Sequence, residues 1–154
     1  MKNNFPFLLC LVFFIISCET VTKTVIDENS IKIIDEKVDF INKDTSLKTI
    51  VVKANAENTI SFYFKNDSIY QIVESGQPSF GSAFTNRYYF SKHQLIVVSE
   101  WSAISVDEKI SENTNNYYFH NQKVIKTEGN HTQPPKTAET LTSEALRLIK
   151  TVKK

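Results

Sequence analysis

The hydrophobic positions of this chain change their spacing three times, and each change marks a different kind of segment. Residues 7–16 form an unbroken apolar run, and residues 31–41 place apolar side chains three or four positions apart. From residue 48 the period becomes two, and the wider spacing returns over residues 138–152. Spacings of three to four predict amphipathic helices, and a period of two predicts strands. The pattern therefore predicts an apolar leader, a helix, a β-region and a second helix.

The β-region contains three copies of one hairpin pattern. In each copy an aromatic triplet precedes a polar pair and then aliphatic residues, and the triplets are Phe62-Tyr63-Phe64, Tyr88-Tyr89-Phe90 and Tyr117-Tyr118-Phe119. A polar pair between two apolar runs predicts a tight hairpin. A two-residue loop then pairs Phe64 with Ile69, Phe90 with Leu95 and Phe119 with Val124. We expect an α+β fold with an antiparallel meander of about six to seven strands.

The period of two divides the side chains of these hairpins between two faces of the sheet. One face is expected to carry Phe62, Tyr88 and Tyr117 together with Val73 and Val97, and both amphipathic helices are expected to pack on that one face.

The tyrosine row, defined as Tyr63, Tyr89 and Tyr118, is expected on the other face of the sheet. Such a row can bind a protein or a glycan, because tyrosine combines a flat apolar ring with a hydroxyl. The alternative is structural, because large aromatic side chains also suit the pleated surface of a sheet.

The connections between the hairpins are expected to be long, at roughly residues 76–85 and 101–114, and to lie at the end opposite the turns. Long loops on a rigid sheet often carry function. They would bring Phe80 and Trp101 to one rim, so these two residues join the tyrosine row as candidate partner surface. The alternatives are a minor hydrophobic cluster beneath the loops or a further edge strand at residues 103–106.

The apolar run at residues 7–16 is too short to cross a bilayer as a helix and is typical of the core of a signal peptide. It leads into Ile15-Ile16-Ser17-Cys18, which resembles the lipobox of bacterial lipoproteins. In that family the cysteine is acylated and becomes the first residue after cleavage. The resemblance implies that Cys18 carries lipid, with an ordinary signal peptide or an uncleaved anchor as alternatives.

Three segments follow from this interpretation. Residues 1–17 form the signal peptide that is removed, residues 18–28 form the lipidated cysteine and a polar tether, and residues 29–154 form a single domain. In lipoproteins an aspartate after the lipidated cysteine can favour the inner membrane. Glu19 holds that place here, so the resemblance implies the outer membrane of the cell envelope rather than the inner membrane.

Composition narrows the class of partner and of chemistry. The two cysteines are Cys10 and Cys18, so the folded body has no thiol for a disulfide or a metal site. Without Lys2, seventeen basic side chains balance seventeen acidic ones, which argues against nucleic acid. Membrane association is therefore expected to come from the lipid rather than from charge.

Catalytic, cofactor and metal motifs are missing from the sequence. It contains no glycine-rich phosphate loop, no nucleophile elbow and no HExxH pattern. The three histidines are His93, His120 and His131, and they occupy unrelated positions of the repeat. We therefore expect no catalytic, cofactor-binding or metal-binding residue, with a site from His120, His131 and a carboxylate as the alternative.

The order of lipobox, tether, helix, repeated YYF hairpins and terminal helix resembles a group of small bacterial lipoproteins of uncharacterised function. Members usually have Asn-Gly in the turns, whereas here Asn66 and Asn121 keep the asparagine and no turn keeps the glycine. The resemblance implies fold and location and supplies no catalytic residue. We expect a non-catalytic envelope module that binds a protein or another envelope component. The alternatives are an envelope hydrolase with scattered catalytic residues or a carrier of an apolar ligand.

Overall fold

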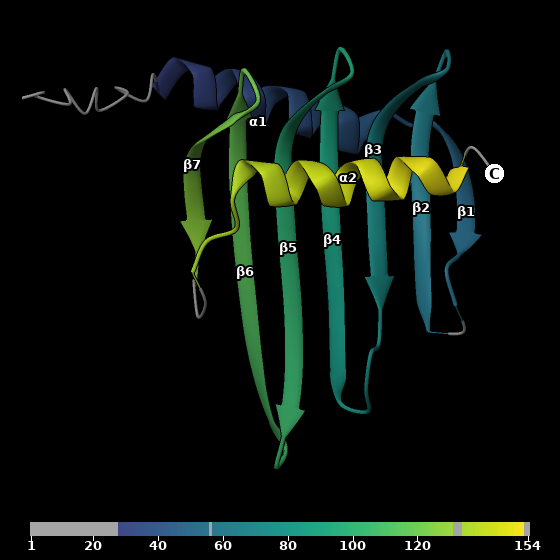
Figure 1. Cartoon of the computed structure of the whole chain (residues 1–154), viewed down its shortest axis with the longest axis vertical. Coiled ribbons are helices and arrows are strands. Elements are labelled where there is room, and N and C mark those ends of the chain that lie inside the picture. The colour runs from purple at the N-terminus through teal and green to yellow at the C-terminus, as the bar shows by residue number, and fades with distance from the viewer. Residues whose placement is uncertain (1–27, 56, 131–133, 153–154) are drawn as a thin grey trace, which may run out of the picture.

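The computed structural model describes residues 28–55, 57–130 and 134–152. The expected signal peptide, Cys18 and His131 lie outside the described residues. The elements are α1 (Glu28–Lys43), β1 (Lys48–Lys53), β2 (Asn58–Lys65), β3 (Ser68–Gly76), β4 (Ser82–Ser91), β5 (Gln94–Val106), β6 (Lys109–His120), β7 (Lys123–Gly129) and α2 (Ala138–Val152). The strands form one antiparallel sheet in sequence order, which confirms the expected α+β meander and fixes its size at seven strands (Figure 1).

Both helices form where the apolar spacing predicts them. The apolar stripe of α1 buries Ile31, Ile34 and Ile41. In α2 the buried residues are Leu141, Ala145 and Leu148, which lie three or four positions apart. Helix α2 begins with a side-chain cap, because the Thr140 backbone N–H donates to Oγ1 of Thr137 at 3.2 Å.

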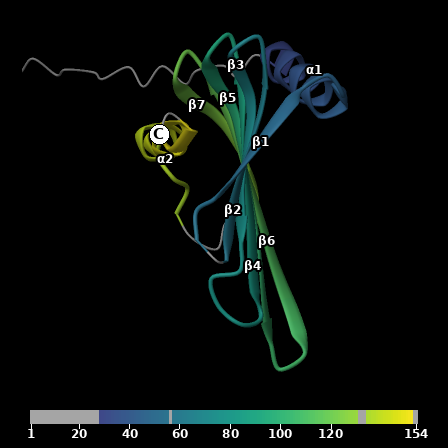
Figure 2. The ribbon, with the colours of Figure 1, turned by 90° about the vertical axis from the view of Figure 1, so that its right-hand side faces the viewer.

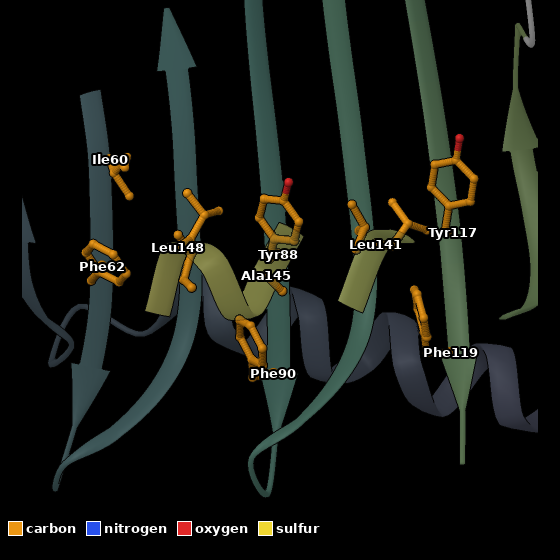
Figure 3. Close-up of a cluster of buried hydrophobic side chains, with 11 residues drawn as sticks. Ile60, Phe62, Tyr88, Phe90, Tyr117, Phe119, Leu141, Ala145 and Leu148 are labelled. Carbon is orange, nitrogen blue, oxygen red and sulfur yellow. The ribbon is translucent and has the colours of Figure 1, made fainter. Parts of the chain in front are cut away.

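The two helices pack on opposite faces of the sheet, whereas the sequence analysis placed both on one face (Figure 2). The face under α2 carries Phe62, Tyr88 and Tyr117, and their side chains cluster with Leu141 and Leu148 (Figure 3). The face under α1 carries a second cluster of Tyr89, Ile96, Val97, Tyr118 and the α1 isoleucines. Where the helices lie, both faces of the sheet are apolar and need a cover, and one helix covers each.

The three hairpins have the expected register next to their turns, and then each one shifts. Phe64 pairs with Ile69, Phe90 with Leu95 and Phe119 with Val124, which confirms the prediction. Each second strand then carries one extra residue that forms a β-bulge, and these residues are Tyr70, Ile96 and Ile125.

The bulges correct the expected faces of the residues that follow them. After an extra residue the in-and-out alternation resumes one position later, so every following side chain changes face. Ile72 and Val98 therefore lie under α2, opposite Phe62 and Tyr88. Val97 packs under α1 instead, and Val73 pairs with Ser61 rather than with a residue of the α2 face.

Four two-residue turns close the hairpins, and all eight of their residues have left-handed backbone angles. In the turn of the β4–β5 hairpin, Lys92 and His93 have φ values of 50° and 63°. Positive φ at both central residues defines the type I′ turn, whose twist matches that of paired strands. The usual Asn-Gly sequence is thus not needed for this geometry, although the left-handed region costs a non-glycine residue free energy.

Introducing Asn-Gly at Lys92-His93 should therefore stabilise the fold. We expect the double substitution Lys92→Asn and His93→Gly to raise the free energy of unfolding by about 1 kcal/mol, because glycine and asparagine tolerate φ near 60°. Urea denaturation measures this change. Asp67→Gly in the Asn66-Asp67 turn is the matched control and should gain less, since asparagine and aspartate already suit these angles. A loss of stability at Lys92-His93 would contradict the assigned turn.

The expected loop at residues 101–114 does not exist. Strands β5 and β6 continue through it as one long hairpin that turns at Asp107-Glu108. The connection between β3 and β4 is short as well, at residues 77–81. We call the extended part of β4, β5 and β6 the arm, which comprises residues 82–87, 99–106 and 109–116. The arm projects beyond both helices (Figures 1 and 2).

Candidate functional site

The tyrosine row lies on the face under α1 and is largely covered. Tyr89 and Tyr118 are buried, at 5% and 9% exposure, and Tyr63 is half-buried. The Tyr89 hydroxyl donates to Oδ1 of Asn42 in α1 at 3.2 Å, and the Tyr118 hydroxyl donates to Oε2 of Glu128 at 3.4 Å. These contacts give Tyr89 and Tyr118 a packing role beneath the helix.

Burial has a measurable consequence for Tyr118. It raises the pKa of this phenol to about 12, and the charges of Asp35 and Glu128 act in the same direction. An unperturbed tyrosine ionises near pH 10. Because the folded pKa is the higher one, the stability tied to neutral Tyr118 is complete below pH 10 and is lost as the pH rises through about 12.

Tyrosinate absorbance tests this shift. We expect the titration difference between the parent and Tyr118→Phe to show one group ionising near pH 12, because α1 shields the phenol. A difference centred near pH 10 would mean that Tyr118 is open to solvent.

The other two candidate residues lie away from the buried tyrosines. Phe80 lies in the β3–β4 connection and is fully exposed. Trp101 lies on the arm and is half-buried, and its indole N–H donates to Oε2 of Glu112 at 3.5 Å. The structure therefore does not bring the five candidates together as one open surface.

A groove lies on the arm, on the same face of the sheet as α2. It was not predicted from the sequence. Its volume is about 390 Å³. Strands β4, β5 and β6 form its floor, and the segment that leads into α2 forms one wall with Pro134 and Lys136. The floor combines two carboxylates, Glu100 and Glu112, with aromatic side chains that include Trp101. It also carries five uncharged polar side chains, which are Asn86, Ser102, Ser111, Asn113 and Asn115.

One ion-pair network borders this groove. The Lys136 ammonium lies 2.7 Å from Oε1 of Glu100 on the floor and 2.8 Å from Oε1 of Glu144 in α2. Burial alone lowers the pKa of Lys136, but hydrogen bonds to both glutamates outweigh it, and the pKa is raised. Burial also raises the pKa of Tyr117, and the Glu100 charge adds to that effect. At neutral pH Lys136 is therefore charged and Tyr117 is neutral.

The groove floor includes Asn115, whose position depends on its pairing with a glycine. Asn115 pairs with Gly129 of β7, where a Cβ would lie 1.9 Å from the Thr114 carbonyl oxygen. The positive φ of Gly129 and this close approach both require glycine. Within the described residues, Oδ1 of Asn115 is buried and has no hydrogen-bond donor. It is therefore an acceptor that a ligand could satisfy.

A second, apolar cleft of about 260 Å³ lies between α1 and the sheet. Its lining includes Ile33, Phe40 and Tyr70. On the other face, Leu141, Ala145 and Leu148 fill the space between α2 and the sheet. The apolar cleft is thus the place where the alternative of an apolar-ligand carrier could apply, and that alternative stays a prediction.

Neither a cluster of metal-ligating side chains nor a membrane-spanning helix is found among the described residues. They contain no group of three or more His, Cys, Asp or Glu side chains placed to hold a metal ion. His93 lies in a turn, and His120 is exposed at the end of β6. None of the helices among these residues is long and apolar enough to cross a membrane.

One sequence signal could have revealed the groove. Residues 111–116 of β6 are polar at every position, whereas Trp101 and Ala103 of β5 alternate with the polar residues Glu100 and Ser102. The alternation in β5 places Glu100 and Ser102 on one face. Lys136 gave no such signal, because only the fold brings it beside Glu100.

Comparisons of the chain with protein-family models, with curated proteins and with solved structures find no match.

Proposed function

We propose that this chain is a lipid-anchored protein of the cell envelope and that its folded domain is a non-catalytic binding module. The observation that carries the proposal is the uncovered arm. Each helix covers one face of the upper sheet, whereas β4, β5 and β6 continue well beyond both helices (Figure 2). None of the arm residues belongs to either helix-covered hydrophobic cluster, so the surface of this extension is available to a partner.

Exposed apolar side chains on the arm support this reading. Ile104, Val106 and Ile110 are 55%, 60% and 69% exposed, and all three lie close to the Asp107-Glu108 turn. Ile104 and Val106 share one face of the tip, and Ile110, which pairs with Ser105, lies on the other. Both faces of the tip therefore offer exposed apolar side chains to a partner.

The amino-terminal segment supports the location. The lipobox-like Ile15-Ile16-Ser17-Cys18 implies an acyl anchor, and α1 begins at Glu28. The ten residues from Cys18 to α1 could extend roughly 33–36 Å, which would let the domain stand clear of the lipid surface. The outer membrane is the proposed membrane.

Crosslinking followed by affinity capture from the native envelope tests this function. We expect the lipidated protein to recover an envelope component and Ile104→Lys on the arm to reduce that recovery at least fivefold. Ile50→Lys is the matched control, since Ile50 is also an exposed strand isoleucine but lies in β1. Equal recovery by both variants would place the binding surface elsewhere on the domain.

A further inference from the structure

We infer that the groove on the arm binds a neutral polyhydroxylated ligand, namely a short segment of an envelope glycan. This inference rests on the proposed function and deepens it, because it assigns a place and a chemical class to the partner. Four features of the groove carry it: its size, its uncharged polar side chains, the pairing of its one lysine and an aromatic flank.

The size of the groove suits a small part of a chain-like ligand. Its volume of about 390 Å³ lies at the lower end of the roughly 300–1,000 Å³ that small-molecule sites occupy. Strands β4, β5 and β6 continue beyond both helices, so the arm offers further surface along which a longer chain could extend (Figure 2).

The polar groups on the floor match hydroxyls better than they match ions. Amide and hydroxyl side chains such as Asn86 and Ser102 both donate and accept hydrogen bonds, as sugar hydroxyls do. The buried Oδ1 of Asn115, with no donor among the described residues, can accept from a ligand hydroxyl.

The one lysine of the groove is already paired, and carboxylates outnumber it, because Glu112 also lines the groove. Glu100 is only 15% exposed at its side chain, and Lys136 pairs with it at 2.7 Å while also pairing with Glu144. An anionic ligand would meet two carboxylates, and a cationic ligand would compete with a lysine already held between them. A neutral ligand leaves this network intact and can use the carboxylate oxygens as acceptors.

An aromatic flank supplies the apolar part of the recognition. Phe84 lines the groove and is half-buried. Its ring lies over Gly76 of β3, where a Cβ would come within 2.9 Å of Cε1. A ring so placed can pack against the C–H face of a sugar, while the amides bind the sugar's hydroxyls.

Binding of defined trisaccharides tests the inference. The lipidated full chain, held in a detergent without a sugar head group, is titrated with triacetylchitotriose, cellotriose and maltotriose by saturation-transfer NMR and calorimetry. We expect at least one of them to bind. Ser102→Phe, which fills the groove, should weaken that binding at least tenfold. Ala103→Phe places the same ring one residue along β5, on the opposite face, and should bind within twofold of the parent.

Two outcomes overturn the inference: none of the three trisaccharides binds, or Ser102→Phe binds as well as Ala103→Phe. Thermal melting checks that each variant folds, and Asn86→Ala, with the same expected loss, replaces Ser102→Phe if that variant does not. Failure here is distinguishable from failure of the proposed function. If the arm captures a protein from the envelope while no trisaccharide binds, the proposed binding module is supported and the glycan ligand is rejected.

Discussion

Replacing Leu148 with alanine should lower the free energy of unfolding by about 2–5 kcal/mol. Leu148 in α2 is fully buried, and it packs with Phe62, Tyr88 and other residues of the α2 face of the sheet (Figure 3). Alanine removes the buried methyl groups and leaves a cavity beneath α2, whose buried side chains all pack in this one cluster among the described residues. Urea denaturation of the parent and the variant measures the difference.

The same helix offers the matched control. Leu146 lies two residues away, but it is 52% exposed and belongs to neither hydrophobic cluster. Leu146→Ala should change the free energy of unfolding by less than about 0.5 kcal/mol, as is usual for surface substitutions. Equal losses at both positions would show that α2 does not pack on the sheet through this stripe.

Cys18→Ala should abolish the incorporation of a labelled fatty acid into this protein. Acylation requires the thiol of the lipobox cysteine, and the chain offers only one other cysteine. Growth with an alkyne fatty acid, capture of the protein and detection of the label measure the effect. We expect the variant to lose essentially all label and to leave the membrane fraction.

Cys10→Ala is the control for this experiment. Cys10 lies in the apolar run of the signal peptide, before the expected cleavage site, so its loss should leave labelling unchanged. Equal labelling of the parent and Cys18→Ala would refute the lipid anchor. The binding module would then need another route to the envelope.

Both helices and three of the two-residue turns could be predicted from the sequence, whereas the covering of the two faces could not. An apolar stripe such as Ile31, Ile34 and Ile41 indicates that a helix packs on another element, but it does not indicate which face of the sheet the helix covers. The aromatic triplets nevertheless indicated that both faces of the sheet are covered. Tyr88, Tyr89 and Phe90 are all buried, and consecutive buried residues in a strand mean that both faces are covered.

The bulges escaped prediction for a related physical reason. The run Leu95-Ile96-Val97-Val98 is apolar at every position, so it satisfies either phase of the alternation. Only the pairing across the sheet shows that Ile96 is the extra residue and that Val98 faces α2. Apolar runs without polar interruptions therefore predict a strand, but they do not predict which of its side chains lie on which face of the sheet.

The arm was not predicted, because the sequence of its long hairpin is typical of a loop. Residues 101–114 contain neither glycine nor proline, and their many polar side chains suggested a loop. The alternation of Ser102, Ile104 and Val106 on one face was nevertheless present. Asp107 and Glu108 then make a type I′ turn with φ values of 49° and 62°, which neither residue signals on its own.

Site-specific photocrosslinking in living cells tests most directly whether the arm binds an envelope component. A photoreactive side chain replaces Ile104 on the arm or, as the control, Ile50 on β1, in the lipidated protein. We expect discrete adducts at position 104 and none at position 50. We also expect glycan-degrading enzymes, rather than a protease, to digest the partner in the adducts at position 104. Equal adducts at both positions, or adducts only at position 50, would contradict binding at the arm.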